Sequence, residues 1–173
     1  MVAASITLSI PPGLVAAPQV SAESTDQKLK DVAAIHGAAG VFAVAGYRMG
    51  ERALKELGLP RGSFAIEVVH HTPAEVQWSC IADGLQAATG ASAGKLNLKL
   101  ASAPADGVET VVTNRQTGQQ LVFRMQPEFI KKFLNLPYDK QPAAGREVAE
   151  LPESKIFSSV TRKVVPQSAP KHE

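Results

Sequence analysis

One cysteine and three of the four histidines are the side chains in this sequence best suited to metal or ligand chemistry. They are Cys80, His36, His70 and His71. Thiolate sulfur and imidazole nitrogen are ligands that zinc and other divalent transition metals prefer. Their spacing matches no zinc-finger pattern, so a site must be assembled from segments far apart in the chain. The alternative is that Cys80 is a small buried core residue, the usual place for a lone cysteine.

Asp83 and Lys95 are the charged residues placed to line the same site. Asp83 follows Cys80 by three residues, so the two side chains share a face if this segment is helical. A carboxylate there could orient a ligand or cap the helix. Lys95 follows Gly94, but Leu96 stands where a phosphate-binding loop needs serine or threonine, which excludes a Walker-type site.

The adjacent histidines fall in a predicted strand. The alternation of side chains over residues 63–71 indicates a β-strand. Successive side chains of a strand point to opposite faces, so at most one of His70 and His71 can face Cys80. The alternative is that both rings are exposed polar groups at the end of the strand.

The helix that carries Cys80 can begin in two ways. Thr72 and Pro73 form a helix-start signal, so one helix could run from Pro73 to Thr89 with Cys80 inside it. Alternatively, Ser79 caps a second helix that begins at Cys80. A thiol at that position is favoured as the thiolate by the helix dipole and the free N–H groups. The periodicity leaves both alternatives open.

Hydrophobic periodicity predicts the other elements and hence the fold class. The expected order is a short helix around residues 29–35, a longer helix over 38–57, the strand over 63–71, the Cys80 helix, strands over 94–100, 108–114 and 119–125, and helices over 127–136 and 143–151. Arg115 lies in the hairpin turn between the last two strands and is expected to be solvated. This order predicts an α+β domain: an α-β-α-β-β-β core with a mixed four-stranded sheet covered by helices, and extra C-terminal helices.

The two ends of the chain differ in character from its middle. Residues 1–22 carry no charged side chain and end in Val20-Ser21-Ala22, a pattern typical of signal-peptide cleavage. No lysine or arginine precedes this run and Pro11-Pro12 interrupts it, so the alternative is a disordered extension. We expect a periplasmic or extracellular protein if residues 1–22 are a signal peptide, and a cytoplasmic one otherwise. The domain is expected over 23–152, with a tail over 153–173.

Composition narrows the classes of partner. The net charge is +2 and aromatic residues make up 5% of the chain, so no basic, aromatic-lined surface for nucleic acid is expected. No run approaches the roughly 20 apolar residues that span a membrane, so no membrane partner is expected either. A length of 173 residues suits one domain with tails.

Several short motifs occur together in a recognisable order. They are His36-Gly37 followed by Ala45-Gly46-Tyr47-Arg48-Met49-Gly50, then Cys80-Ile81-Ala82-Asp83-Gly84-Leu85-Gln86-Ala87-Ala88-Thr89-Gly90, then Gly94-Lys95-Leu96-Asn97-Leu98, and the hairpin Asn114-Arg115-Gln116-Thr117-Gly118. Together they resemble the E-subunit family of formylmethanofuran dehydrogenase over about residues 29–138. The resemblance implies an α-β-α-β-β-β domain that pairs as a homodimer, with a helix that begins near Cys80. Relatives in methanogens accompany a molybdenum or tungsten enzyme acting on carbon dioxide and methanofuran, whereas many bacterial relatives stand alone.

The sequence departs from the family pattern in its first motif. Members commonly carry His-Gly-His-x-Cys-Pro-Gly, whereas this chain has Ala38 for the second histidine and Gly40 for the cysteine. The cysteine-rich zinc module at the C-terminus of some relatives is also missing. The resemblance therefore leaves His36 and Cys80 as ligands, with His70 or His71 as a replacement.

Two functions from different classes fit the sequence. We expect a stand-alone protein, similar to this family, that binds zinc, another divalent transition metal or a small ligand. The expected metal ligands are His36, Cys80 and one of His70 and His71, and the residues expected to line the same pocket are Asp83 and Lys95. The alternative is a non-catalytic structural or partner-binding module whose metal site has degenerated. No motif indicates a catalytic residue.

Overall fold

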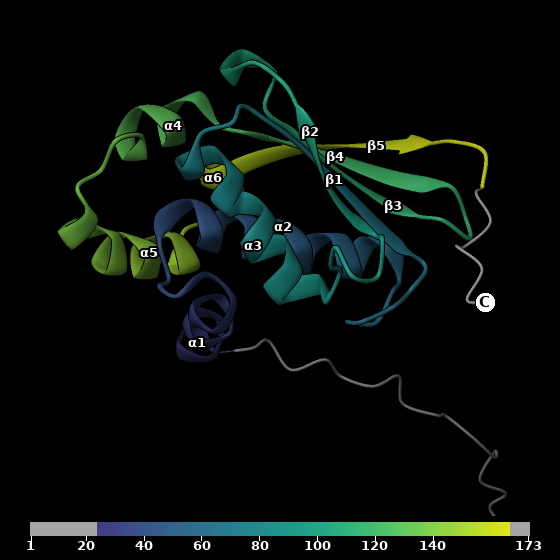
Figure 1. Cartoon of the computed structure of the whole chain (residues 1–173), viewed down its shortest axis with the longest axis horizontal. Helices are drawn as coiled ribbons and strands as arrows, with labels where there is room; N and C mark the ends of the chain where they lie inside the picture. Colours follow the sequence, from purple (N-terminus) through teal and green to yellow (C-terminus); the bar gives the residue numbers. More distant parts are fainter. Residues whose placement is uncertain (1–23, 167–173) are drawn as a thin grey trace, which may run out of the picture.

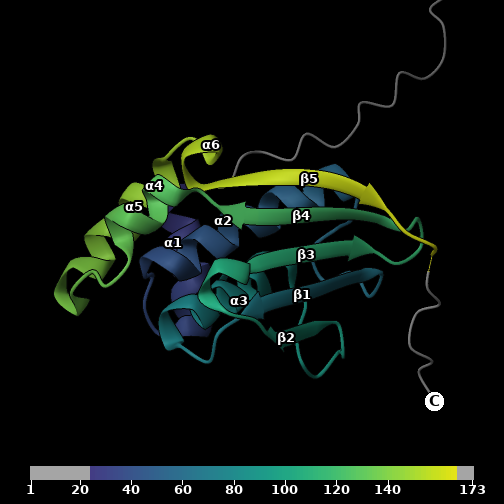
Figure 2. The ribbon, with the colours of Figure 1, turned by 90° about the horizontal axis from the view of Figure 1, so that it is seen from above.

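The centre of the molecule is a mixed five-stranded sheet, described by a computed structural model that covers residues 24–166. The strands are β1 (Ile66–Thr72), β2 (Leu98–Ser102), β3 (Glu109–Asn114), β4 (Gln119–Met125) and β5 (Phe157–Lys163). Their order across the sheet is β2-β1-β3-β4-β5, with β1 and β2 parallel and every other neighbouring pair antiparallel. Figure 2 shows the strands side by side. The predicted α+β class with a mixed sheet is confirmed.

Besides the sheet, residues 24–166 form six α-helices. They are α1 (Thr25–His36), α2 (Val41–Leu57), α3 (Val76–Thr89), α4 (Pro127–Phe133), α5 (Gln141–Glu150) and α6 (Glu153–Ile156). Figure 1 shows α2 and α3 against the sheet, with α1 and α5 packed on them from the far side. Within residues 24–166 no single helix is long and apolar enough to cross a membrane, and α1 and α2 meet that test only as a pair bent by 114°.

The closest contact in the core joins α2 to α3, backbone to backbone. A Cβ atom added to Gly46 would lie 2.1 Å from the carbonyl oxygen of Ile81, and one added to Gly84 would lie 1.8 Å from that of Ala43. These distances lie far inside van der Waals contact, so only glycine allows the two helices to approach this closely. The glycines inside α2, which lower helix propensity, are therefore explained by packing.

The side chains of strand β1 alternate between the face of the sheet that the helices cover and the open face. Ile66, Val68, His70 and Thr72 are buried, whereas the residues between them are partly exposed. This alternation follows from the twofold period of a strand. His70 thus points toward the helices and His71 points away from them, onto the open face.

The fifth strand corrects the predicted four-stranded sheet and the predicted tail over 153–173. Strand β5 pairs along its whole length with β4, from Phe157 opposite Met125 to Lys163 opposite Gln119. Only Phe157 is buried, and its ring meets that of Phe123 edge to face at 5.3 Å. The other β5 side chains are exposed at the sheet edge, so this strand has no apolar alternation by which to predict it. The expected signal segment, residues 1–22, lies outside the described residues.

The start of β2 also differs from expectation. The strand begins at Leu98 rather than at residue 94, because residues 93–96 form a turn. Leu96 adopts a left-handed φ of 55° in that turn and is 65% exposed. The alternating leucines that suggested a longer strand therefore fall partly in a turn and partly on an exposed edge strand.

Substituting Gly84 by alanine tests the α2–α3 contact. We expect Gly84→Ala to lower the free energy of unfolding by at least about 2 kcal/mol, because the new methyl group would overlap the Ala43 carbonyl and push the helices apart. Gly94→Ala is the matched control, since nothing lies within 4 Å of its added Cβ, and a change within about 1 kcal/mol is expected. Urea unfolding followed by circular dichroism measures both. Equal stability of the two variants would contradict the assignment.

Candidate functional site

His36 and Cys80 line one cavity of about 480 Å³, although 44 positions separate them in the sequence. The cavity lies among the end of α1, the start of α2, the first turns of α3 and the segment that leads into α5. Its lining residues are His36, Ala38, Gly40, Val41, Phe42, Ala43, Val76, Gln77, Cys80, Asn135, Leu136, Tyr138 and Gln141. The sulfur and the imidazole thus belong to a common pocket.

Asp83 holds the ring of His36. The Nδ1 atom of His36 lies 2.7 Å from Oδ2 of Asp83, which stands one helical turn after Cys80 on α3. A carboxylate accepts hydrogen bonds, so Nδ1 carries the hydrogen and donates it. The other ring nitrogen, Nε2, has no hydrogen-bond partner within residues 24–166. His36 is the last residue of α1, and the left-handed Gly37 (φ 85°) then turns the chain toward α2.

Cys80 lies inside a single helix, as in the first of the two alternatives that the sequence left open, although that helix begins later than Pro73. Helix α3 runs from Val76 to Thr89, with Glu75 rather than Thr72 at its N-cap. Cys80 is its fifth residue and is half-buried. Burial and, next, the negative charge of Asp83 raise the pKa of the Cys80 thiol to about 11. The expectation of a helix beginning at Cys80 and favouring the thiolate was wrong, and the thiol is neutral at physiological pH.

Helix α2 begins at the wall of the cavity. Its N-cap, Gly40, has no side chain to accept a hydrogen bond from the first turn. The N–H of Val41 donates instead to Oε1 of Gln141, 3.1 Å away and 100 residues later in the chain. The next two residues, Phe42 and Ala43, also line the cavity, and helix geometry gives their N–H groups no partner within the helix.

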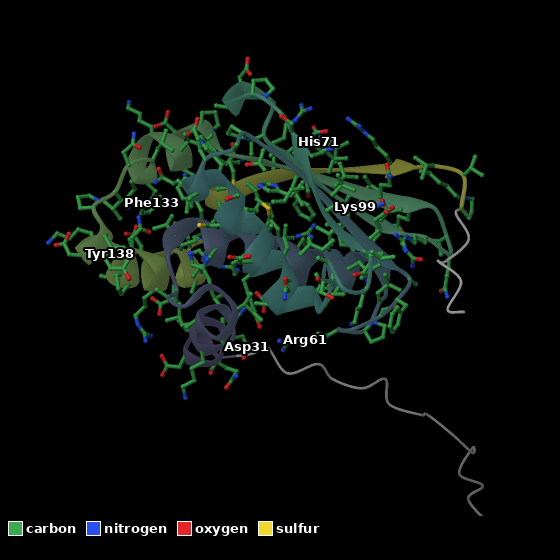
Figure 3. The ribbon with its side chains drawn as sticks, in the orientation of Figure 1. Asp31, Arg61, His71, Lys99, Phe133 and Tyr138 are labelled. Atoms are coloured by element: carbon green, nitrogen blue, oxygen red, sulfur yellow. The ribbon has the colours of Figure 1, made fainter. Side chains whose placement is uncertain are left out.

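The segment between α4 and α5 closes one side of the cavity. The N–H of Asn135 donates to Oε1 of Gln77 at 3.2 Å, and Nε2 of Gln141 donates to the carbonyl of Leu136 at 3.1 Å. Tyr138 stands at the rim and is 84% exposed (Figure 3). Sequence reasoning missed Gln77 and Gln141, because a glutamine carries no local signal that distinguishes a site residue from a surface residue.

Helix α5 is fixed to α2 by a cap and a close approach. Nη1 of Arg48 donates to the carbonyls of Val148, Ala149 and Leu151, at 3.2, 2.7 and 3.0 Å. These carbonyls lie at the end of α5, where a helix leaves its acceptors unpaired. At the other side, a Cβ on Gly145 would lie 1.9 Å from the Ala39 carbonyl. Gln141 is thereby positioned over the start of α2.

His70 does not belong to the cavity. It is fully buried in β1, where Nδ1 lies 2.9 Å from Oγ1 of Thr110 and Nε2 lies 3.1 Å from the carbonyl of Trp78. A carbonyl only accepts, so Nε2 carries the hydrogen and Nδ1 accepts from the hydroxyl of Thr110. Burial lowers the pKa of His70 to about 4. Both nitrogens are occupied, which makes His70 a neutral core residue and leaves no nitrogen for a metal.

His71 and Lys95 also lie away from Cys80. His71 is on the open face of the sheet, opposite Glu109 of β3 (Figure 3). Lys95 donates through Nζ to the carbonyls of Gly62 and Gly90, at 3.2 and 2.9 Å. Gly90 caps the far end of α3, about 15 Å along the helix from Cys80. Of the expected site residues, the structure brings together only His36, Cys80 and Asp83.

The residues around the cavity fit a resident zinc ion poorly. A structural zinc site uses four protein ligands and a catalytic one uses three. Nowhere in residues 24–166 are three or more His, Cys, Asp or Glu side chains grouped so that they could hold a metal ion. His36 and Cys80 would supply two ligands at most.

Because the imidazole of His70 is buried, we expect the folded chain to lose stability in mild acid. The pKa of His70 is about 4 in the folded chain and about 6.5 when unfolded, so the unfolded state binds the extra proton between these values. The contribution of His70 to the free energy of unfolding is therefore complete above about pH 6.5. As the pH falls toward 4, about 3 kcal/mol of that contribution is lost. We expect His70→Gln, measured by urea unfolding across this range, to show a smaller loss than the wild-type chain. Parallel pH profiles would refute the assignment.

Comparison with known proteins agrees with this architecture. The family model described as "FmdE, Molybdenum formylmethanofuran dehydrogenase operon" matches residues 35–158. Among solved structures, the chain is similar to a tungsten formylmethanofuran dehydrogenase FmdE-like protein from Syntrophus aciditrophicus, with a TM-score of 0.56 and 18% identity over 84% of this chain and 75% of that one. No curated protein matches the chain. The family match spans most of the described residues and includes His36, Cys80 and Asp83, so the chain belongs to the FmdE family.

Proposed function

We propose that this FmdE-family protein binds a small organic molecule in the cavity between α2, α3 and the segment before α5. The observation that carries the proposal is the convergence of His36, held by Asp83, and Cys80 on one cavity of about 480 Å³. Cavities that bind small molecules commonly measure about 300–1,000 Å³. They combine apolar walls with a few placed polar groups.

The walls support an organic ligand. Val76 and Leu136 supply apolar surface, the buried Val41 and Phe42 lie behind it, and the polar groups are few. Phe42 is held rigidly, because its ring packs edge to face against Trp78 at 5.5 Å and against Phe129 at 5.9 Å. A wall fixed in this way is formed before a ligand arrives, which lowers the entropic cost of binding.

The His36–Asp83 pair supports a role in holding or moving a proton. In the neutral imidazole, Nδ1–H donates to Asp83 and the lone pair of Nε2 remains free. A free imidazole nitrogen can accept a hydrogen bond or a proton from a bound molecule. The pair could therefore accept a proton from a ligand or donate a hydrogen bond to it. Cys80, as a neutral thiol, adds a soft, weakly polar wall.

Occupation of the cavity by a dye with an apolar body and one sulfonate tests the proposal. We expect 1-anilinonaphthalene-8-sulfonate to bind the native chain with one-to-one stoichiometry and a rise in fluorescence. Ala38→Phe should weaken that binding at least about tenfold, because a phenyl ring would fill space that Ala38 leaves open. Fluorescence titration gives both constants.

The matched control is Ala34→Phe, the same change at an exposed position of α1 outside the cavity lining. It should bind the dye as the wild-type chain does. Absence of stoichiometric dye binding to the folded wild-type chain would remove the ligand-binding proposal and favour a structural or partner-binding module.

Metal content separates an organic ligand from a metal site. We expect the wild-type chain and Cys80→Ala to contain the same amount of zinc and other transition metals after dialysis, because two protein ligands hold such an ion weakly. Elemental analysis by mass spectrometry measures it. One equivalent of metal in the wild-type chain that Cys80→Ala lacks would reverse this conclusion in favour of metal binding. Homodimer formation and export stay predictions.

A further inference from the structure

We infer that residues 134–140, the segment between α4 and α5, form a lid over the cavity, and that Tyr138 covers a bound ligand when the lid closes. The inference rests on the proposed function, because a lid has a role only if the cavity takes a ligand. It follows from the way the segment is anchored at its ends, from its attachment between them and from the exposure of Tyr138.

Both ends of the lid segment are fixed to the body of the protein. Before it, the ring of Phe133 is buried and packs on that of Phe129, with 4.8 Å between the ring centroids. After it, Gly145 of α5 lies so close to the Ala39 carbonyl that no Cβ would fit, and Arg48 holds the end of that helix. Movement is therefore confined to the residues between two anchored helices.

Between these anchors the segment buries little surface. Leu134 and Leu136 are partly buried, the other five residues are exposed, and none is fully buried. Asn135 adopts a left-handed φ of 63° where α4 has ended. A segment with few buried apolar contacts opens locally at a low free-energy cost. Residues 134–140 are thus the part of the cavity wall best able to move.

Two glutamine side chains fasten the lid segment to the helices around the cavity. Oε1 of Gln77 on α3 accepts the N–H of Asn135 at 3.2 Å, and Nε2 of Gln141 donates to the carbonyl of Leu136 at 3.1 Å. Oε1 of Gln141 also accepts the N–H of Val41 on α2. A hydrogen bond between neutral groups contributes only modestly to stability. These bonds therefore hold the lid near the cavity without preventing its movement.

Tyr138 is the large side chain that the segment presents at the mouth of the cavity. It belongs to the lining, yet it is 84% exposed (Figure 3). Val76 on α3 also belongs to the lining and is 79% exposed. Burial of an aromatic ring against an apolar ligand is favourable, and the hydroxyl of a tyrosine can remain in water. A bound ligand therefore favours the lid position in which the Tyr138 ring lies over it.

Hydrogen exchange of the full chain, with and without bound 1-anilinonaphthalene-8-sulfonate, tests the closure of the lid. We expect the dye to slow exchange of a peptide spanning residues 134–140 at least about fivefold, because a closed lid protects amides that otherwise open freely. The exposed 3₁₀ turn Ala105–Gly107 lies outside the cavity lining, and its exchange should be the same in both samples. Mass spectrometry of the peptides measures both rates.

Dissociation of the dye, followed by stopped-flow fluorescence, tests Tyr138 and Gln77. Tyr138→Ala removes the covering ring, so the dye should leave at least about fivefold faster, and Tyr138→Phe, which keeps the ring, should restore slow dissociation. Gln77→Ala removes the acceptor of the Asn135 N–H and should also speed dissociation. Gln86→Ala is the matched control, the same change on α3 outside the cavity lining, and should release the dye as the wild-type chain does.

Exchange without dye separates fastening of the lid from direct contact with the ligand. Gln77→Ala should speed exchange of residues 134–140 in the empty protein, a change that loss of a ligand contact would not produce. Normal exchange there would overturn the fastening by Gln77. Bound dye that leaves exchange of residues 134–140 unchanged, or wild-type dissociation from Tyr138→Ala, would overturn the lid. In each of these results the cavity remains a ligand site. Failure of the dye to bind the wild-type chain is the separate result that removes the proposed function.

Discussion

The structure depends on one constraint, the backbone contact between α2 and α3. Gly46 and Gly84 each leave the space that a carbonyl group of the opposite helix occupies. Contact at this distance fixes the relative rotation and translation of the two helices, since any side chain there would separate them. Cys80 and Asp83 lie on α3 just before and beside this contact, so their positions relative to the start of α2 follow from it. Two glycines without reactive side chains thus fix where the reactive side chains around the cavity lie.

A second, long-range tie completes the cavity. Arg48 of α2 caps the end of α5, and Gln141 at the start of α5 caps the beginning of α2. The two helices therefore satisfy each other's unpaired backbone groups across about 100 positions of sequence. This exchange places the uncharged amide of Gln141 at the cavity wall.

Histidines in one chain have opposite roles because their surroundings differ. His70 has both nitrogens bonded in the core and a pKa held near 4, so it contributes to stability as a neutral group. His36 has one nitrogen bonded to a carboxylate and the other free at a cavity. Burial with full hydrogen bonding leaves a histidine no free nitrogen, whereas a free nitrogen at a cavity can bond to a bound molecule.

The sequence by itself determined the elements whose signals are local. The alternation of β1, the hairpin of β3 and β4, the amphipathic α2 and the α+β class all follow from side-chain periodicity and turn residues, and the family motifs paired His36 with Cys80. Tertiary structure decided the rest. Strand β5 forms by pairing with the edge of β4, and Lys95 binds the C-terminal end of α3. Arg115, expected to be solvated, is buried, and its Nη2 lies 2.8 Å from Oε1 of Glu67. Periodicity reports whether a residue is buried within its own element, but a hydrogen-bond partner that lies tens of residues away leaves no trace in the local pattern.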